Sequence, residues 1–299
     1  MTKSSLHWVG LLLAFGLVPA TAETIEIGGV TRTYQAILPE RKPAPLVLVL
    51  HGNWQHGADM ATRTAWPDMA RREGFAIVFP DGLNRAWADL RAKAERVGRT
   101  PPSGTDDIAF LSALVETYLT NGVADPKRVY VTGLSNGGAM TMSMACARTD
   151  MFAAAASVII NLTDGLAASC RPSRPIPLLL MNGTDDPLVP FNGGKGTSWF
   201  GVDGFWSTSR TVQFWRGKNG CDAADGPGTD LADRDPEDGS TVTLVASRCP
   251  PGRDVALYRV NGGGHRFPGT KPDARMQAVC QTDRNVDPRS ASNLDPSIA

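Results

Sequence analysis

The chain has 299 residues, of which 42% are hydrophobic and 20% are charged, and its 30 basic residues balance 30 acidic ones. A chain of this length and composition is expected to form one soluble domain with a sizeable core. Because the formal net charge is zero, no broad electrostatic field favours nucleic acid or an anionic membrane surface as a partner. The composition therefore indicates a neutral small molecule or polymer as the partner, and it predicts no oligomeric state.

Residues 1–22 have the pattern of a secretory signal peptide. Lys3 precedes an eleven-residue apolar run over residues 8–18, and Ala20-Thr21-Ala22 has the A-x-A form of a cleavage site. A membrane anchor is the alternative, but this run is too short for a helix across a bilayer, which needs about 20 residues. We therefore expect cleavage after Ala22, a secreted or periplasmic location and no stable membrane association.

Short apolar runs alternate with helical stretches through residues 23–269, which are expected to form the catalytic domain. An alternating pattern around Gly28-Gly29 predicts a hairpin. Continuous apolar runs, typical of strands buried on both faces, occur at 45–50, 75–79, 128–132, 152–158, 176–181 and 255–260. Helices are predicted over 59–72 and over 106–119, the latter entered through Thr105-Asp106-Asp107. This order predicts an α/β fold, with a mainly parallel sheet and helices on both faces. Residues 270–299 are polar and are expected to form a poorly ordered tail.

A G-x-S-x-G motif, Gly133-Leu134-Ser135-Asn136-Gly137, directly follows a predicted strand and begins a helical stretch. In this context the motif forms a tight strand-to-helix turn that exposes the serine hydroxyl above the edge of the sheet. The positive end of the helix beneath the turn favours a developing negative charge. The motif therefore predicts that Ser135 is a nucleophile in an α/β-hydrolase fold.

A serine hydroxyl needs a general base, and the base needs an acid that orients it. His265 lies on a glycine-rich loop after the last predicted strand, at the edge of the sheet where such enzymes collect their catalytic groups. The alternative is an ordinary loop histidine. The acid should be Asp185 or Asp186, which follow the strand over 176–181. Many hydrolases of this fold resemble G-T-x-D-x-x-V-P here, which selects Asp186 and leaves Asp185 as a solvated turn residue. The chain order serine, aspartate, histidine is that of α/β-hydrolases.

An oxyanion hole should complete the site. One donor is expected to be the backbone N–H of Asn136, the residue after the nucleophile. The other is expected from the loop after the strand over 45–50, with the N–H of Asn53 as first choice and that of Trp54 as second. His51 in the same loop is predicted to be structural rather than a second base.

The five cysteines are expected to form two disulfides in an oxidising compartment. Cys221 and Cys249 flank an Asp- and Gly-rich stretch that would otherwise be loose, and Cys146 with Cys170 is the second predicted pair. Cys280 is then left over in the polar tail. Metal binding is the alternative, but the sequence has no C-x-x-C and no His/Cys cluster, so we expect no metal site.

Seven blocks resemble the secreted poly(3-hydroxybutyrate) depolymerase and feruloyl esterase group of the family 1 carbohydrate esterases, from about residue 46 to 268. The blocks are LHGNWQHGADM, GFAIVFPDG, RAWAD, DDIAFLSALV, DPKRVYVTGLSNGGAM, GTDDPLVPF and GGGHRFPG. The resemblance implies hydrolysis of a carboxylic ester through an acyl-enzyme, without a metal or organic cofactor. Two departures stand out: Asn53 and Trp54 replace the glycine or cysteine of many relatives, and the apolar closing helix after the histidine loop is missing.

The substrate is less closely defined. Trp54, Trp87 and Trp199 are predicted to line an acyl pocket, with Phe200 and Trp206 nearby, but packing within the core and loops is an equal alternative. Residues 193–206 lie where this fold inserts cap elements, and the sequence leaves open whether they act as a lid. Hydroxycinnamoyl, hydroxybutyrate and synthetic esters all remain candidates. A serine peptidase and a non-catalytic binding protein on the same fold are the rival classes.

Overall fold

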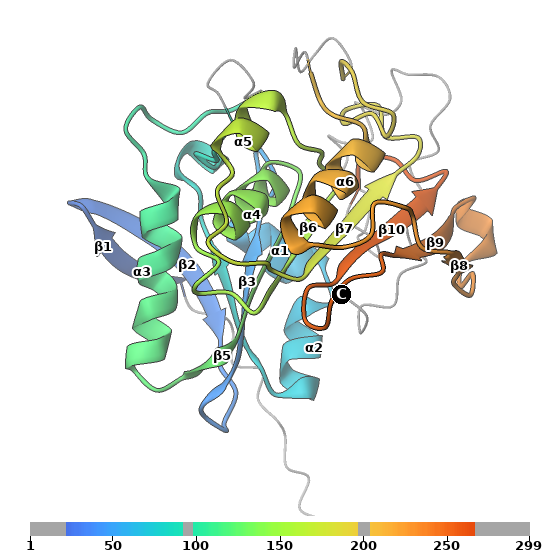
Figure 1. Ribbon diagram of the computed structural model, residues 1–299. Helices are drawn as coiled ribbons and strands as arrows, with labels where there is room; N and C mark the ends of the chain where they lie inside the picture. The colour runs from blue at the N-terminus through green and yellow to red at the C-terminus, as the bar shows by residue number, and fades with distance from the viewer. Residues whose placement is uncertain (1–21, 92–97, 197–203, 267–299) are drawn as a thin grey trace, which may run out of the picture.

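The computed structural model describes residues 22–91, 98–196 and 204–266, in which ten strands form one central sheet (Figure 1). The strands are β1 (Ala22–Ile27), β2 (Val30–Ile37), β3 (Ala44–Leu50), β4 (Ala76–Pro80), β5 (Ala124–Leu134), β6 (Ala154–Val158), β7 (Leu178–Gly183), β8 (Gly228–Asp230), β9 (Thr241–Ala246) and β10 (Val255–Asn261). Their order in the sheet is β1-β2-β4-β3-β5-β6-β7-β10-β9-β8. The six central strands are parallel to one another: β4, β3, β5, β6, β7 and β10. At both edges each strand is antiparallel to its inner neighbour. The predicted α/β class is thus confirmed.

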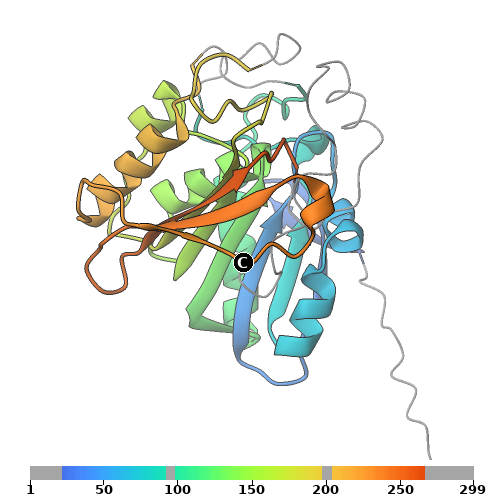
Figure 2. The same cartoon turned by 90° about the vertical axis from the view of Figure 1, so that its right-hand side faces the viewer.

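Helices cover both faces of the sheet, as predicted (Figure 2). They are α1 (Gly57–Arg63), α2 (Trp66–Glu73), α3 (Asp107–Thr120), α4 (Asn136–Ala147), α5 (Asp164–Ser169) and α6 (Thr208–Asn219), with 3-10 turns η1 (Leu83–Arg85) and η3 (Pro236–Asp238). Side chains of α1 and α2 share one core with one face of the sheet. Side chains of α3, α4 and α6 share a second core with the opposite face. No described helix is long and apolar enough to cross a membrane.

The single helix predicted over 59–72 is wrong, because this stretch forms two helices. Thr64 ends α1 with an extended backbone (φ −117°, ψ 165°). Pro67 stands in the first turn of α2, where its missing N–H costs no helical hydrogen bond. The apolar spacing continues across the break, so the periodicity alone did not reveal it.

The start of α3 is tied to the rest of the domain by buried charges. Asp106 caps the helix by accepting a hydrogen bond from the Ala109 N–H (2.9 Å). Asp107 is fully buried and pairs with Arg32 of β2 (2.6 Å), and its second oxygen accepts the N–H of Ala88 (2.7 Å). A buried carboxylate is tolerated only with such partners. Asp107 thereby joins β2, α3 and the loop that follows β4.

An apolar cavity of about 550 Å³ opens on the face of the sheet that carries α2. Its walls include Val47, Trp66, Tyr130 and Leu179, which come from α2 and from the early part of the strands. The predicted catalytic residues follow the opposite ends of the strands, so this cavity is not the predicted active site. The tail expected over 270–299 lies outside the described residues.

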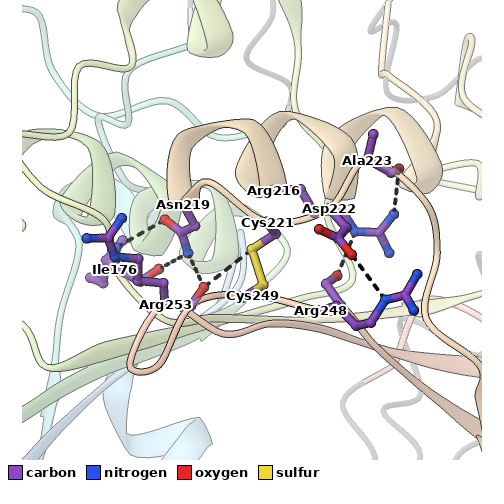
Figure 3. The surroundings of a disulfide bond; sticks show 10 residues. Ile176, Arg216, Asn219, Cys221, Asp222, Ala223, Arg248, Cys249 and Arg253 are labelled. Atoms are coloured by element: carbon purple, nitrogen blue, oxygen red, sulfur yellow. Dashed lines mark hydrogen bonds and ion pairs between the residues drawn. A yellow bond between two sulfur atoms is a disulfide. The ribbon is translucent and has the colours of Figure 1, made fainter.

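Both predicted disulfides are present. Cys146 near the end of α4 is bonded to Cys170, which follows α5, and both residues are buried. Cys221 after α6 is bonded to Cys249 after β9 (Figure 3). An ion pair between Asp222 and Arg248 (3.1 Å) closes the same junction on its outer side. Cys280 lies outside the described residues.

We predict that the Cys221–Cys249 bond stabilises the domain mainly by lowering the conformational entropy of the unfolded chain. The bond closes a loop with a sequence separation of 28 residues, which corresponds to about 3–4 kcal/mol in the chain-entropy model. Replacing both cysteines by serine should lower the free energy of unfolding in urea by that amount. Equal stability of the double variant and the parent would contradict this assignment.

Candidate active site

Ser135 occupies the junction between β5 and α4. It is the single residue between Leu134, which ends the strand, and Asn136, which begins the helix. Its backbone has φ 56° and ψ −116°, a conformation that costs a non-glycine residue of order 1–3 kcal/mol. Its N–H donates to the carbonyl of Val158 at the end of β6 (2.8 Å). The serine is therefore held in a strained turn at the carboxyl edge of the parallel strands.

The two outer glycines of the motif are required by close backbone contacts. A Cβ on Gly137 would lie 2.4 Å from the carbonyl oxygen of Leu50 and 2.5 Å from that of His51. A Cβ on Gly133 would lie 2.5 Å from the carbonyl oxygen of Gly137. Any side chain at these positions would push the turn away from the end of β3. The glycines thus allow the serine turn and the loop after β3 to lie against each other.

The structure brings Ser135, His265 and Asp186 into one hydrogen-bonded chain. Nε2 of His265 lies 2.9 Å from Oγ of Ser135, and Nδ1 lies 2.7 Å from Oδ2 of Asp186. The histidine and the aspartate are 6% and 5% exposed. Because the carboxylate accepts the Nδ1–H, Nε2 is left to accept a hydrogen bond from the hydroxyl of Ser135.

Asp186 and its neighbour Asp185 have different surroundings. The second oxygen of Asp186 accepts the N–H groups of Leu188 (2.8 Å) and Val189 (2.9 Å), which fix the carboxylate toward His265. Asp185 is exposed, and its carboxylate accepts the hydroxyl of Thr184 (2.8 Å). Of the two aspartates weighed from the sequence, Asp186 is the one that reaches the histidine.

The two choices for the second oxyanion donor also differ. The N–H of Trp54 donates to the carbonyl of Arg85 (2.9 Å), so it is already bound and unsuited to the oxyanion. This hydrogen bond argues against the second choice as a donor. The other predicted donor, Asn136, is the first residue of α4, and the first N–H groups of a helix have no acceptor within the helix.

A buried polar network holds Asn136, and the sequence did not reveal it. The carboxamide of Asn136 accepts the N–H of Trp87 (2.7 Å) and donates to Oδ2 of Asp89 (2.9 Å). Asp89 in turn accepts two side-chain hydrogen bonds from Arg91, each 2.8 Å long. All of these residues are at most 6% exposed. The RAWAD block noted in the sequence carries part of this network, but it has no local pattern that points to Asn136, 47 residues later.

His51 anchors the loop after β3, as predicted, and is buried completely. Its Nδ1–H donates to the carbonyl of Gly52 (2.7 Å), and its Nε2 accepts the N–H of Gly82 (2.9 Å). Burial lowers the pKa of His51 to about 4. A neutral ring with both nitrogens engaged holds the loop and is not available as a base.

The predicted pocket tryptophans lie in different places. Trp87 is fully buried, packs on the ring of His51 (4.8 Å between centroids) and donates its indole N–H to the His51 carbonyl (2.9 Å). Trp87 therefore belongs to the packing under the loop, and its assignment to the substrate pocket is wrong. Trp54 is half-buried in the loop itself. Trp199 and Phe200 lie outside the described residues, and so does part of the cap segment over 193–206.

Trp206 lies beside α6 and is held by polar contacts. Its indole N–H donates to Asp164 (2.6 Å), and the guanidinium of Arg210 stacks on its ring at 3.6 Å. Among the described residues, no group of three or more His, Cys, Asp or Glu side chains could hold a metal ion.

This fold, with a strained serine turn at the carboxyl edge of a mainly parallel sheet, defines an α/β-hydrolase. The family model for esterase PHB depolymerase matches residues 34–170. A protein named "Putative esterase NocK", from Nocardia uniformis subsp. tsuyamanensis, is 31% identical over 278 residues, which is 89% of this chain and 79% of the relative. The chain belongs to the esterase PHB depolymerase family and is a carboxylic ester hydrolase.

Other relatives match over part of their length. Feruloyl esterase B of Piromyces equi is 28% identical over 75% of this chain and 40% of its own length. Feruloyl esterase C of Emericella nidulans is 32% identical over 51% of this chain and 53% of its own. The chain thus spans about half or less of these two enzymes. An acetyl xylan esterase from Aspergillus awamori has the same fold, with a TM-score of 0.57 at 15% identity, over 87% of this chain and 97% of the other.

The contrast between the two aspartates gives a prediction. Asp186→Asn should lower kcat by about 10⁴, as loss of the orienting acid does in serine triads, because the histidine loses its tautomer and its orientation. Asp185→Asn is the matched control and should change kcat less than twofold, since its carboxylate faces solvent and Thr184. Steady-state hydrolysis of a p-nitrophenyl ester measures both, and a reversed order of the two effects would contradict the assignment.

The buried ring of His51 gives a prediction about pH and stability. The pKa falls from 6.5 in the unfolded chain to about 4 in the folded one. The unfolded chain therefore binds the proton more tightly. The folded state, in which the ring of His51 is neutral, therefore has its full stability above pH 6.5 and loses part of it as the pH falls toward 4.

Between pH 7.5 and 4.5, wild-type protein should lose about 2–3 kcal/mol more unfolding free energy than His51→Gln. Urea titrations of both proteins at the two pH values measure this difference. Parallel losses in the two proteins would show that His51 does not titrate as described.

Proposed function

We propose that the chain is an exported serine esterase that works through an acyl-enzyme, with Ser135 as nucleophile, His265 as general base and Asp186 as the orienting acid. The observation that supports this most directly is the continuous hydrogen-bonded chain of 2.9 Å and 2.7 Å through the three side chains. Membership of an esterase family agrees with it.

In the proposed acylation step, Oγ of Ser135 attacks the ester carbonyl carbon while its proton moves to Nε2 of His265. The carbonyl oxygen gains the negative charge, which the N–H groups of Asn136 and Asn53 would stabilise. The tetrahedral intermediate collapses, the C–O bond to the alcohol breaks, and His265 returns the proton to the leaving oxygen. Water then repeats the sequence on the acyl-enzyme and releases the acid.

We propose an aromatic hydroxycinnamoyl ester or a short hydroxyacyl ester as substrate. The half-buried indole of Trp54 lies in the loop expected to supply the oxyanion donor, and an aromatic wall there favours an aromatic acyl group. The similarity to feruloyl esterases and to the esterase PHB depolymerase family supports this choice of classes.

We also propose export with cleavage after Ala22. The pattern of residues 1–22 supports it. Two disulfides suit an oxidising compartment.

The test is the loss of one hydroxyl group. Ser135→Ala should reduce kcat by at least about 10³-fold on methyl ferulate, hydroxybutyrate oligomers and p-nitrophenyl esters alike. The melting temperature should not fall, because the side chain lies in a strained turn and does little packing. Ser103→Ala, at an exposed serine, is the control and should keep full activity.

Phenylmethylsulfonyl fluoride should label Ser135 in the wild-type protein, as peptide mapping would show. Full hydrolysis by Ser135→Ala would refute the proposal. A wild-type protein that hydrolyses no ester in the panel would favour the non-catalytic alternative, and cleavage of peptides in its place would favour the peptidase.

A further inference from the structure

The side chain of Asn53 pairs with the main chain of a residue far along the sequence. Its Nδ2 donates to the carbonyl of Arg99 (2.7 Å), and its Oδ1 accepts the N–H of Arg99 (2.9 Å). One carboxamide thus satisfies both main-chain groups of Arg99, as a neighbouring strand would. The loop after β3 is thereby bound to residues 98–100.

A second asparagine, Asn84, binds the same segment. Its Nδ2 donates to the carbonyl of Thr100 (2.9 Å), and its Oδ1 accepts the guanidinium of Arg99 (2.9 Å). Asn84 and Arg85 both have positive φ values, of 53° and 60°, and the carbonyl of Arg85 accepts the N–H of Trp54 (2.9 Å). Hydrogen bonds therefore connect the loop after β3 to two segments of the β4–α3 connection, residues 84–85 and 98–100, around the peptide that joins Asn53 to Trp54.

Gly98 packs directly on the side chains of Asn53 and Trp54. A Cβ on Gly98 would lie 2.8 Å from two carbons of the Trp54 indole and 2.9 Å from Oδ1 of Asn53. Trp54 itself has φ 66°, which a bulky residue adopts only where its surroundings enforce it. The contacts of Asn53 and Gly98 are among the interactions that enforce it.

We propose that the Asn53 side chain is a positioning residue for the oxyanion hole, one that holds the Gly98–Thr100 segment against Trp54 and so directs the Asn53 N–H toward the developing oxyanion. This inference rests on the proposed esterase mechanism.

The first test removes the carboxamide. Asn53→Ala should lower kcat about 10- to 100-fold on a p-nitrophenyl ester, which is less than the 10²- to 10³-fold loss of a whole oxyanion donor. KM should stay within about twofold. The inhibition constant of phenylboronic acid, which forms a tetrahedral adduct with the serine, should rise by the same factor as kcat/KM falls. The pH profile of kcat/KM should keep its shape, because His265 and Asp186 are untouched.

The second test approaches the contact from the other loop. Gly98→Ala should lower kcat in the same way, because the added methyl group collides with Trp54. Gly104→Ala is the matched control. Gly104 also has a positive φ (80°, against 74° at Gly98), but an added Cβ there meets no atom within 4 Å. The control should therefore suffer similar backbone strain and keep the kcat of the wild type.

Titration of active sites with a fluorophosphonate separates positioning from folding. Losses that vanish when rates are divided by titrated sites would overturn the proposal. So would an unchanged kcat and boronate affinity in Asn53→Ala, or equal losses in Gly98→Ala and Gly104→Ala. An Asn53→Ala variant that keeps full activity while Ser135→Ala is inactive refutes the positioning role alone. An active Ser135→Ala refutes the proposed mechanism.

Discussion

The strained turn at Ser135 is the constraint on which the rest of the site depends. A positive φ at a serine is unfavourable, and it persists because β5 and α4 are both fixed by the core on either side of it. Eleven of the twelve residues of α4 are buried, so the helix cannot shift to relieve the turn. Close backbone contacts at Gly133 and Gly137 then place the loop after β3 directly beside the serine. The hydroxyl and the candidate oxyanion donors thus share one rigid edge.

The other two side chains of the site reach the serine through neighbouring strands. β7 and β10 are adjacent and parallel, and Gly183 at the end of one pairs with Val260 near the end of the other. The loops that follow remain paired: the N–H of Thr184 donates to Val260, and a Cβ on Gly183 would lie 2.1 Å from the carbonyl of Gly263. Asp186 and His265 leave from these two loops. Their alignment therefore follows from main-chain pairing, before any contact between the side chains.

Local patterns predicted the sheet class, the serine turn and the pairing of the cysteines, because each depends on residues close in sequence or on strand order. The features that could not be predicted depend on contacts between distant loops. The carboxamides of Asn53 and Asn136 bind partners 46 and 49 residues away, and no periodicity encodes such contacts. For the same reason the sequence left two equal places for Trp87, because an indole in a loop looks the same whether it faces a pocket or packs on His51.

Polar contacts add what the apolar core leaves undefined. A helix that is apolar on all sides can slide or rotate along its axis at little cost, because hydrophobic burial has no direction. In α4, the carboxamide of Asn136 fixes the first turn, and the hydroxyl of Ser143, which accepts the N–H of Leu90 (2.9 Å), fixes the middle. The bond from Cys146 to Cys170 fixes the last turn. A serine hydroxyl that must lie within hydrogen-bond distance of a histidine on another loop needs this axial position to within a fraction of an ångström. The buried polar groups of α4 are therefore placed where their directionality sets the position of Ser135.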